Sequence, residues 1–131
     1  MKKSIIMFGL FIFLGSVLFA QVRQVQFIAV ASLDRTEKSQ VSNRAARAPY
    51  YLLFDESGKL LEVIVNPFYD SARSAGPKVA NLLVGKNVTI VVAEDFGSKM
   101  IAVLNKEGIN YYKASGIVKK AVEELIRSNQ F

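Results

Sequence analysis

The 131-residue chain is 51% hydrophobic and 21% charged, a balance that supports one packed domain and excludes a disordered tail. It contains no cysteine and no histidine, which excludes disulfides, nucleophilic catalysis by a Cys–His or Ser–His pair, and a zinc or thiolate-held iron–sulfur site made by this chain alone. The net charge of +6 comes from basic residues spread along the chain without an aromatic-interleaved patch, so nucleic acid is not an expected partner.

The first 20 residues have the anatomy of a signal peptide. Two lysines precede an apolar run of about 15 residues that ends at Ala20, and a helix of that length, roughly 22 Å, is short of the roughly 30 Å hydrocarbon core. We therefore expect residues 1–20 to be removed and residues 21–131 to form one extracytoplasmic domain, periplasmic or secreted. Leu18 stands where a small residue is preferred, so an uncleaved membrane anchor is the alternative.

Three strands are predicted in the first half of the domain. Phe27–Ala31 is an apolar run with β-branched members, typical of a buried strand. Residues 33–48 carry six charged residues and no apolar periodicity, which predicts a loop, and loops this long are mobile or functional. Tyr50–Phe54 and Leu60–Val65 flank a turn that contains Gly58, so they predict a β-hairpin.

The second half alternates helices with strands. Its predicted elements are a helix over Gly76–Gly85 with a proline in the first turn, a strand over Val88–Ala93, a helix from Ser98 to Gly108, a strand over Ile109–Tyr112 and a last amphipathic helix capped by Ser115. Val88–Ala93 is β-branched and apolar apart from one threonine, as in a strand covered on both faces.

This element order predicts a five-stranded mixed α/β sheet with three helices. The hairpin makes the second strand antiparallel, and each strand–helix–strand passage joins parallel strands by a right-handed crossover. The simplest strand order is 3-2-1-4-5. Ligands of open α/β sheets bind where the connections diverge, here at the carboxyl ends of strands 1 and 4.

A helix start at that edge is the candidate ligand site. The unpaired N–H groups of the helix that begins at Ser98 favour a negatively charged ligand. Lys99 in its first turn is unfavourable by about 0.3 to 1 kcal/mol unless an anion is near, and that anion is either Asp95 or a ligand. The predicted ligand-binding residues are Asn43, Arg44, Arg47, Asn66, Asp95, Gly97, Ser98 and Lys99.

A catalytic alternative rests on two acidic residues. Asp34 and Asp95 follow strands 1 and 4, and two carboxylates at neighbouring strand ends could share Mg²⁺ in a nuclease or phosphotransferase of ribonuclease-H type. Acidic residues are common in loops, and nearby arginines and lysines would pair with them, so this alternative ranks below a binding function.

Four stretches in order resemble a known family. They are FIAVAS, VSNRAARAPYYLLFDESGKLLEVIVN, GPKVANLLVGKNVTIVVAEDFGSKMIAVLNKEGINYY and SGIVKKAVEEL, and together they resemble the dinitrogenase iron–molybdenum cofactor biosynthesis family of NifX-type carriers and the NifB C-terminal region. The resemblance implies a ribonuclease-H-like α/β domain that binds or carries a metallocluster, of iron–sulfur or iron–molybdenum type, and does no chemistry on it. Where that family commonly has a His-Phe-Gly stretch, this chain has residues 43–47, NRAAR.

The sequence thus predicts a non-catalytic, exported domain that binds a small anionic or metallocluster-type ligand. The alternative is an envelope protein-interaction module that keeps the fold and has lost the ligand, which the missing histidine favours. Any cluster would be held by charge, backbone N–H groups and carboxylate or amide oxygens.

Processing at the N-terminus is directly testable. We expect the protein recovered from an extracytoplasmic fraction to begin near Gln21, as N-terminal sequencing would show. Soluble cytosolic protein that still begins at Met1 would contradict the signal-peptide assignment.

Overall fold

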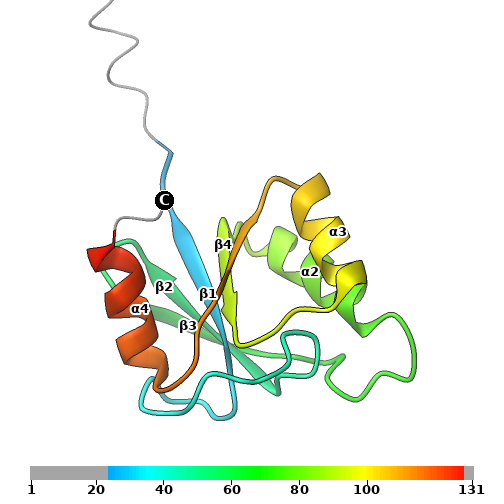
Figure 1. Cartoon of the computed structure of the whole chain (residues 1–131), viewed down its shortest axis with the longest axis horizontal. Coiled ribbons are helices and arrows are strands. Elements are labelled where there is room, and N and C mark those ends of the chain that lie inside the picture. The colour runs from blue at the N-terminus through cyan, green and yellow to red at the C-terminus, as the bar shows by residue number, and fades with distance from the viewer. Residues whose placement is uncertain (1–23, 129–131) are drawn as a thin grey trace, which may run out of the picture.

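The computed structural model describes residues 24–128 (Figure 1), so the expected signal peptide lies outside the described residues. Five strands form one sheet in the order β3-β2-β1-β4-β5, which confirms the predicted order. The strands are β1 (Phe27–Ser32), β2 (Tyr50–Asp55), β3 (Leu60–Val65), β4 (Ile90–Ala93) and β5 (Asn110–Lys113), and the helices are α2 (Ala75–Gly85), α3 (Ser98–Lys106) and α4 (Val118–Arg127). As predicted, β2 runs antiparallel to β1 and β3, while β4 is parallel to β1 and β5.

Helices cover both faces of this sheet, with α2 and α3 on one face and α4 on the other (Figure 1). Successive strand residues point to opposite faces. Ala29 and Val91 therefore pack under α2 and α3, and Ile28 and Val92 pack under α4. Since both faces of β1 and β4 are buried, their residues form the apolar runs seen in the sequence. Among residues 24–128, no helix is both long and apolar enough to cross a bilayer.

Hydrogen bonds that the sequence does not reveal correct three of the predicted boundaries. The N–H of Val88 donates to the carbonyl of Leu83 at 3.2 Å, so Val88 closes the end of α2 and β4 begins at Ile90, two residues later than predicted. The N–H of Ile109 donates to the carbonyl of Leu104 at 2.9 Å, so Ile109 closes the end of α3 and β5 begins one residue later than predicted. The prediction that Ser115 caps the last helix is wrong, because α4 starts at Val118 with Ile117 in the N-cap position and without a side-chain cap.

Backbone carbonyls of the long loop take the place of that cap. The N–H groups of Val118 and Lys119, at the start of α4, donate to the carbonyls of Ser39 and Glu37, each at 2.9 Å. Two of the N–H groups that a helix start leaves without an intrahelical acceptor are thereby bonded. The loop over residues 33–48 is therefore part of how α4 is held against the sheet.

Close packing of α2 on α3 depends on one glycine. A Cβ atom at Gly76 would lie 3.0 Å from the Cβ and 3.2 Å from the backbone N of Met100, which is fully buried. Neither atom belongs to a flexible chain end, so a larger residue at this position would push the two helices apart.

We expect Gly76→Ala to lower the free energy of unfolding by about 1 to 3 kcal/mol, as overpacked cores do. Gly85→Ala is the matched control, because nothing lies within 4 Å of a Cβ there, and it should change stability by less than about 0.5 kcal/mol or raise it slightly. Urea titration measures both. Equal effects of the two substitutions would contradict a packing role for Gly76.

Candidate functional site

The crevice between the carboxyl ends of β1 and β4 is filled by backbone of the long loop. The N–H of Ser42 donates to the carbonyl of Ala31 at 2.8 Å, and the carbonyl of Ser42 accepts the N–H of Glu94 at 3.0 Å. Ser42 is 2% exposed. One loop residue thus bridges the ends of two strands, and a ligand at this edge has to bind on the outer side of the loop.

The next residues of the loop lie beside the turn from β4 into α3. The hydroxyl oxygen of Ser42 accepts the N–H of Arg44 at 3.3 Å and donates to its carbonyl at 3.2 Å, which closes a tight turn. The N–H of Ala45 then donates to the carbonyl of Asp95 at 3.0 Å. Asn43 and Arg44 are exposed, and their backbone is fixed against the turn that leads to Lys99.

Asn66 and Tyr51 hold the loop from below. Asn66 is 1% exposed, and its amide donates to the carbonyls of Ala46 at 3.1 Å and Ala48 at 2.8 Å. Its side-chain oxygen accepts the N–H of Phe68 at 2.9 Å. The hydroxyl of Tyr51 donates to the carbonyl of Ala45, and burial raises the pKa of this tyrosine well above its usual range. The amide of Asn66 is thus fully occupied with backbone, which makes it a support of the loop.

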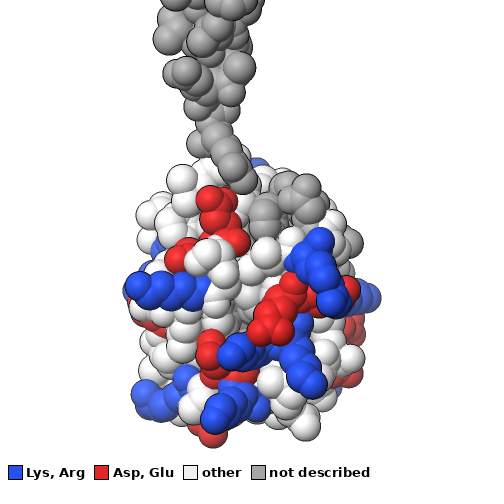
Figure 2. Space-filling view, turned by 90° about the vertical axis from the view of Figure 1, so that its left-hand side faces the viewer, with Lys and Arg blue, Asp and Glu red and all other residues white. Residues whose placement is uncertain are grey.

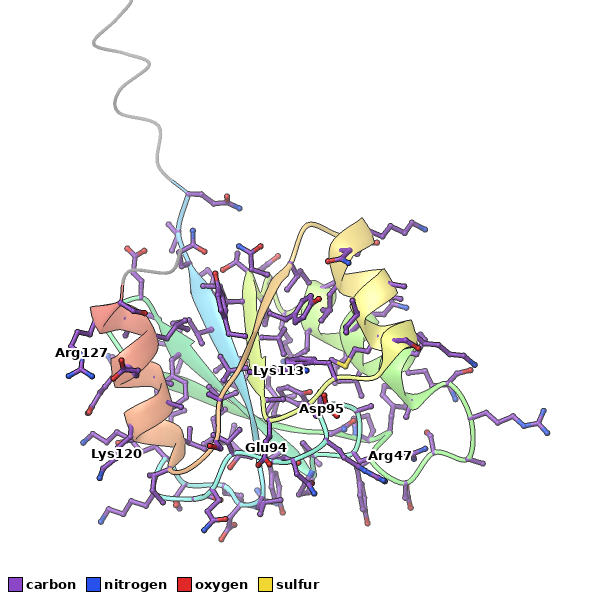
Figure 3. The ribbon with its side chains drawn as sticks, in the orientation of Figure 1. Arg47, Glu94, Asp95, Lys113, Lys120 and Arg127 are labelled. Atoms are coloured by element: carbon purple, nitrogen blue, oxygen red, sulfur yellow. The ribbon has the colours of Figure 1, made fainter. Side chains whose placement is uncertain are left out.

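Arg47 joins two loops. Its guanidinium donates to the carbonyls of Ser71 at 2.5 Å and Tyr69 at 3.3 Å, both in the segment between β3 and α2. Arg47 is half-buried, and in the view of Figure 3 it lies toward the same end of the molecule as Glu94 and Asp95, whereas Lys120 and Arg127 lie along α4.

Asp95 is paired with the neighbouring strand and not with Lys99. Its carboxylate lies 3.3 Å from the ammonium of Lys113, and both side chains are exposed. A hydrogen bond from the N–H of Phe96, and then the Lys113 ammonium, hold the pKa of Asp95 below its usual value. The sequence predicts that either Asp95 or a ligand is the anion near Lys99, and Asp95 pairs with Lys113 instead. Within residues 24–128, neither Lys99 nor Arg44 forms a salt bridge.

The start of α3 is open. Gly97 occupies the N-cap position without a side-chain hydrogen bond, and the first turn holds no acidic residue. In the described part of the chain no acceptor is bonded to the N–H groups of Ser98 and Lys99. Gly97, Ser98 and Lys99 are all exposed. The positive end of the helix dipole therefore faces solvent, next to a lysine that has no carboxylate partner.

The eight predicted residues thus fall into two groups. Six of them are exposed, on two segments that the backbone bond from Ala45 to Asp95 joins: Asn43, Arg44, Asp95, Gly97, Ser98 and Lys99. Asn66 and Arg47 lie behind or beside this group, with their polar atoms bonded to loop carbonyls. Sequence reasoning missed Ser42 and Tyr51. A serine two residues before Arg44 was the available signal for the tight turn, since hydroxyls commonly bond backbone two residues on.

The described residues offer few side chains that could coordinate a metal ion at this edge of the sheet. In residues 24–128 no three Asp or Glu side chains gather closely enough to hold a metal ion, and the chain has no histidine or cysteine. Asp34 is exposed and accepts the N–H of Arg35 at 2.7 Å, while Asp95 pairs with Lys113. The exposed residues around Arg44 and Lys99 therefore offer positive charge and N–H donors, and not a set of side chains that coordinate a metal ion.

Comparison with known proteins adds the family. The family described as dinitrogenase iron-molybdenum cofactor matches residues 26–128, nearly all of the described chain. The chain belongs to this family. Among curated proteins no sequence matches it. Members of the dinitrogenase iron-molybdenum cofactor family are generally accessory or carrier proteins, and membership suggests involvement in the biosynthesis or carriage of that cofactor.

Solved structures share the fold. TM1290 from Thermotoga, described as a candidate NifB protein, is 31% identical, with a TM-score of 0.66 over 80% of this chain and 90% of that one. The apo form of the orange protein from Desulfovibrio gigas is 22% identical, with a TM-score of 0.75 over 82% and 92%. PH0822 is 23% identical, with a TM-score of 0.67 over 79% and 92%. The last two likenesses concern the fold alone.

The anchoring role of Asn66 can be measured. We expect Asn66→Ala to lower the free energy of unfolding by about 2 to 4 kcal/mol, because it leaves two carbonyls and one N–H without their partner. Asn81→Ala is the control, since Asn81 is exposed on α2, and it should stay within about 0.5 kcal/mol of the parent. Thermal and urea unfolding give the comparison. An unchanged stability in Asn66→Ala would contradict the anchoring role.

Proposed function

We propose that this protein is an exported, non-catalytic carrier that binds a small anionic, metallocluster-type ligand on the outer side of the loop that closes the carboxyl edge. The observation that carries the proposal is a pair of exposed cations that have no carboxylate partner in the described residues. Arg44 lies in the turn whose next residue bonds the carbonyl of Asp95, and Lys99 lies in the first turn of α3, whose start is open. Two unpaired cations beside free N–H groups are a favourable place for an anion.

Charge is the means of binding that this chain offers. Without cysteine or histidine, it has no thiolate or imidazole to bond the metals of an iron–sulfur or iron–molybdenum cluster. An anionic cluster presents sulfur or oxygen atoms at its surface, and these accept hydrogen bonds from guanidinium, ammonium and backbone N–H groups. Asn43 adds an exposed amide at the same edge. In this proposal the cluster is cargo, held reversibly and released intact.

A carrier role also accounts for what the site lacks. No group of three or more Asp, Glu, His or Cys side chains accompanies Arg44 and Lys99 in the described residues. The nuclease alternative needs Asp34 and Asp95 to share a metal ion, but Asp95 is held by Lys113 and by the N–H of Phe96. Binding without chemistry is the function that these groups support best.

An envelope protein-interaction module is the second candidate. The observation in its favour is residues 43–47, NRAAR, where the family resemblance led us to expect a His-Phe-Gly stretch. If the ligand has been lost with the histidine, the folded domain remains and Arg44 and Lys99 have no small anion to bind. Both candidates place the domain outside the cytoplasm, or on the membrane if residues 1–20 are retained.

Tetrathiomolybdate, molybdate and phosphate are suitable probes, since they differ in size and in sulfur content but are all anions. We expect tetrathiomolybdate to bind, and Arg44→Ala and Lys99→Ala each to raise its dissociation constant about tenfold or more, equivalent to about 1.4 kcal/mol. Both side chains are exposed, so melting temperatures should barely change. Arg47→Ala should also weaken binding, but with a loss of stability, because Arg47 bonds Tyr69 and Ser71.

Lys106→Ala is the matched control, because Lys106 is an exposed lysine in the last turn of the same helix. It should leave binding unchanged in titration calorimetry. Absence of binding by all three anions in the parent protein would favour the interaction module, and binding that is unaffected by both Arg44→Ala and Lys99→Ala would place the site elsewhere.

A further inference from the structure

The two edges of the sheet are not equally protected against another strand. In the described residues β3 and β5 each pair on one side only. The four-residue β5 ends at the charged Lys113, and a charged side chain on an edge discourages pairing. The six-residue β3 has the sequence LLEVIV, with one charged residue. A long apolar edge strand is a template for pairing with another chain.

The ladder between β2 and β3 fixes which backbone groups point outward. Asn66 donates to the carbonyl of Pro49 at 3.0 Å, so this pair is a hydrogen-bonded one. Hydrogen-bonded and non-hydrogen-bonded pairs alternate along an antiparallel ladder. Val65, opposite Tyr50, and Val63, opposite Leu52, are therefore in non-hydrogen-bonded pairs. Their N–H and C=O groups point away from β2, out of the edge.

Apolar side chains accompany these groups, which have no hydrogen-bond partner among residues 24–128. Val65 is 55% exposed and Leu61 is 45% exposed, although most of β2, the strand with which β3 pairs, is buried. Helix α4 covers β1, and its outer surface carries interleaved basic and acidic side chains (Figure 2). The apolar strip of β3 thus combines unpaired backbone with β-branched side chains, and an extended strand with apolar side chains is the partner that satisfies both.

The charges on β3 allow the pairing strand to be the β3 of a second copy of this chain. The single acidic residue, Glu62, binds the ammonium of Lys86 at 2.7 Å. Among the antiparallel registers that match the outward groups of Val63 and Val65, one is centred on Val63 and one on Ile64. In the first, Glu62 lies opposite Ile64 of the second copy, and in the second it lies opposite Asn66. Neither register opposes two glutamates, which would be destabilising.

We propose that two copies of this chain pair antiparallel along β3, so that one continuous sheet runs through a closed, two-fold symmetric dimer. The interface uses the same edge of both copies and leaves no further β3 edge to recruit a third. A β-bulge, where the register shifts between Leu53 and Phe54, sits at the hairpin end of β3. Bulges twist an edge out of line, so pairing is confined to the second half of the strand.

Sedimentation velocity over a concentration series tests the proposal on the protein in the form recovered from its expression host. The parent should pass from monomer to dimer, and Val65→Lys should raise the dimer dissociation constant at least tenfold. Val63→Pro, which removes an outward N–H without removing a bond to β2, should do the same. Val25→Lys is the control, since Val25 is 56% exposed but lies outside β3, and it should leave the dimer intact.

Amide hydrogen exchange is measured on the parent protein, so it tests the proposal even if a variant folds poorly. In the parent protein, the N–H groups of Val63 and Val65 should become more protected as concentration rises, while those of Tyr111 and Lys113 on the β5 edge should not. A parent that stays monomeric at every concentration would overturn the proposal. So would a dimer that Val65→Lys leaves unchanged, or assembly that continues beyond the dimer.

Discussion

The two backbone hydrogen bonds of Ser42 are the constraint on which the rest of the carboxyl edge of the sheet depends. Parallel strands leave carbonyls and N–H groups unpaired where they end, and a buried group of this kind is costly unless it is bonded. Here the backbone of Ser42 bonds Ala31 at the end of β1 and Glu94 just after β4. Because the loop is fixed at this point, its neighbours reach the β4–α3 turn on one side and the start of α4 on the other.

Because the loop is fixed at Ser42, some of its residues face inward and others face solvent. Residues that face inward, such as Ala45 and Ala48, are small and buried, and Asn66 and Tyr51 bond their carbonyls or those of their neighbours. The residues that face solvent include the charged Arg44. Arg44 is thereby displayed on a rigid segment beside an open helix start, which spares a ligand the entropic cost of ordering the loop. Preorganised positive charge is what a carrier without metal-binding side chains requires.

The sheet was predictable because its signals are local or topological. The apolar runs at β1 and β4 mark strands buried on both faces, and the Gly58 hairpin together with right-handed crossovers determines the strand order. The loop was not predictable in detail, because its bonds are backbone bonds between segments far apart in the sequence, such as Val118 to Ser39. Such bonds carry no residue signature, and for this reason the prediction that Ser115 caps α4 is wrong. Asn66 was recognised as important, but the sequence could not distinguish an amide that faces a ligand from one that faces its own backbone.

Native mass spectrometry of the protein taken from its own cells tests the central claim most directly. If the cargo is an anionic cluster held by charge, the protein sprayed at low ammonium acetate concentration should carry an added mass that contains metal and sulfur. That mass should leave as a unit when the ammonium acetate concentration is raised, since salt screens exposed charges. Protein that carries no added mass even at low ionic strength, or a bound metal that persists at high ionic strength, would contradict a carrier that binds its cargo by charge.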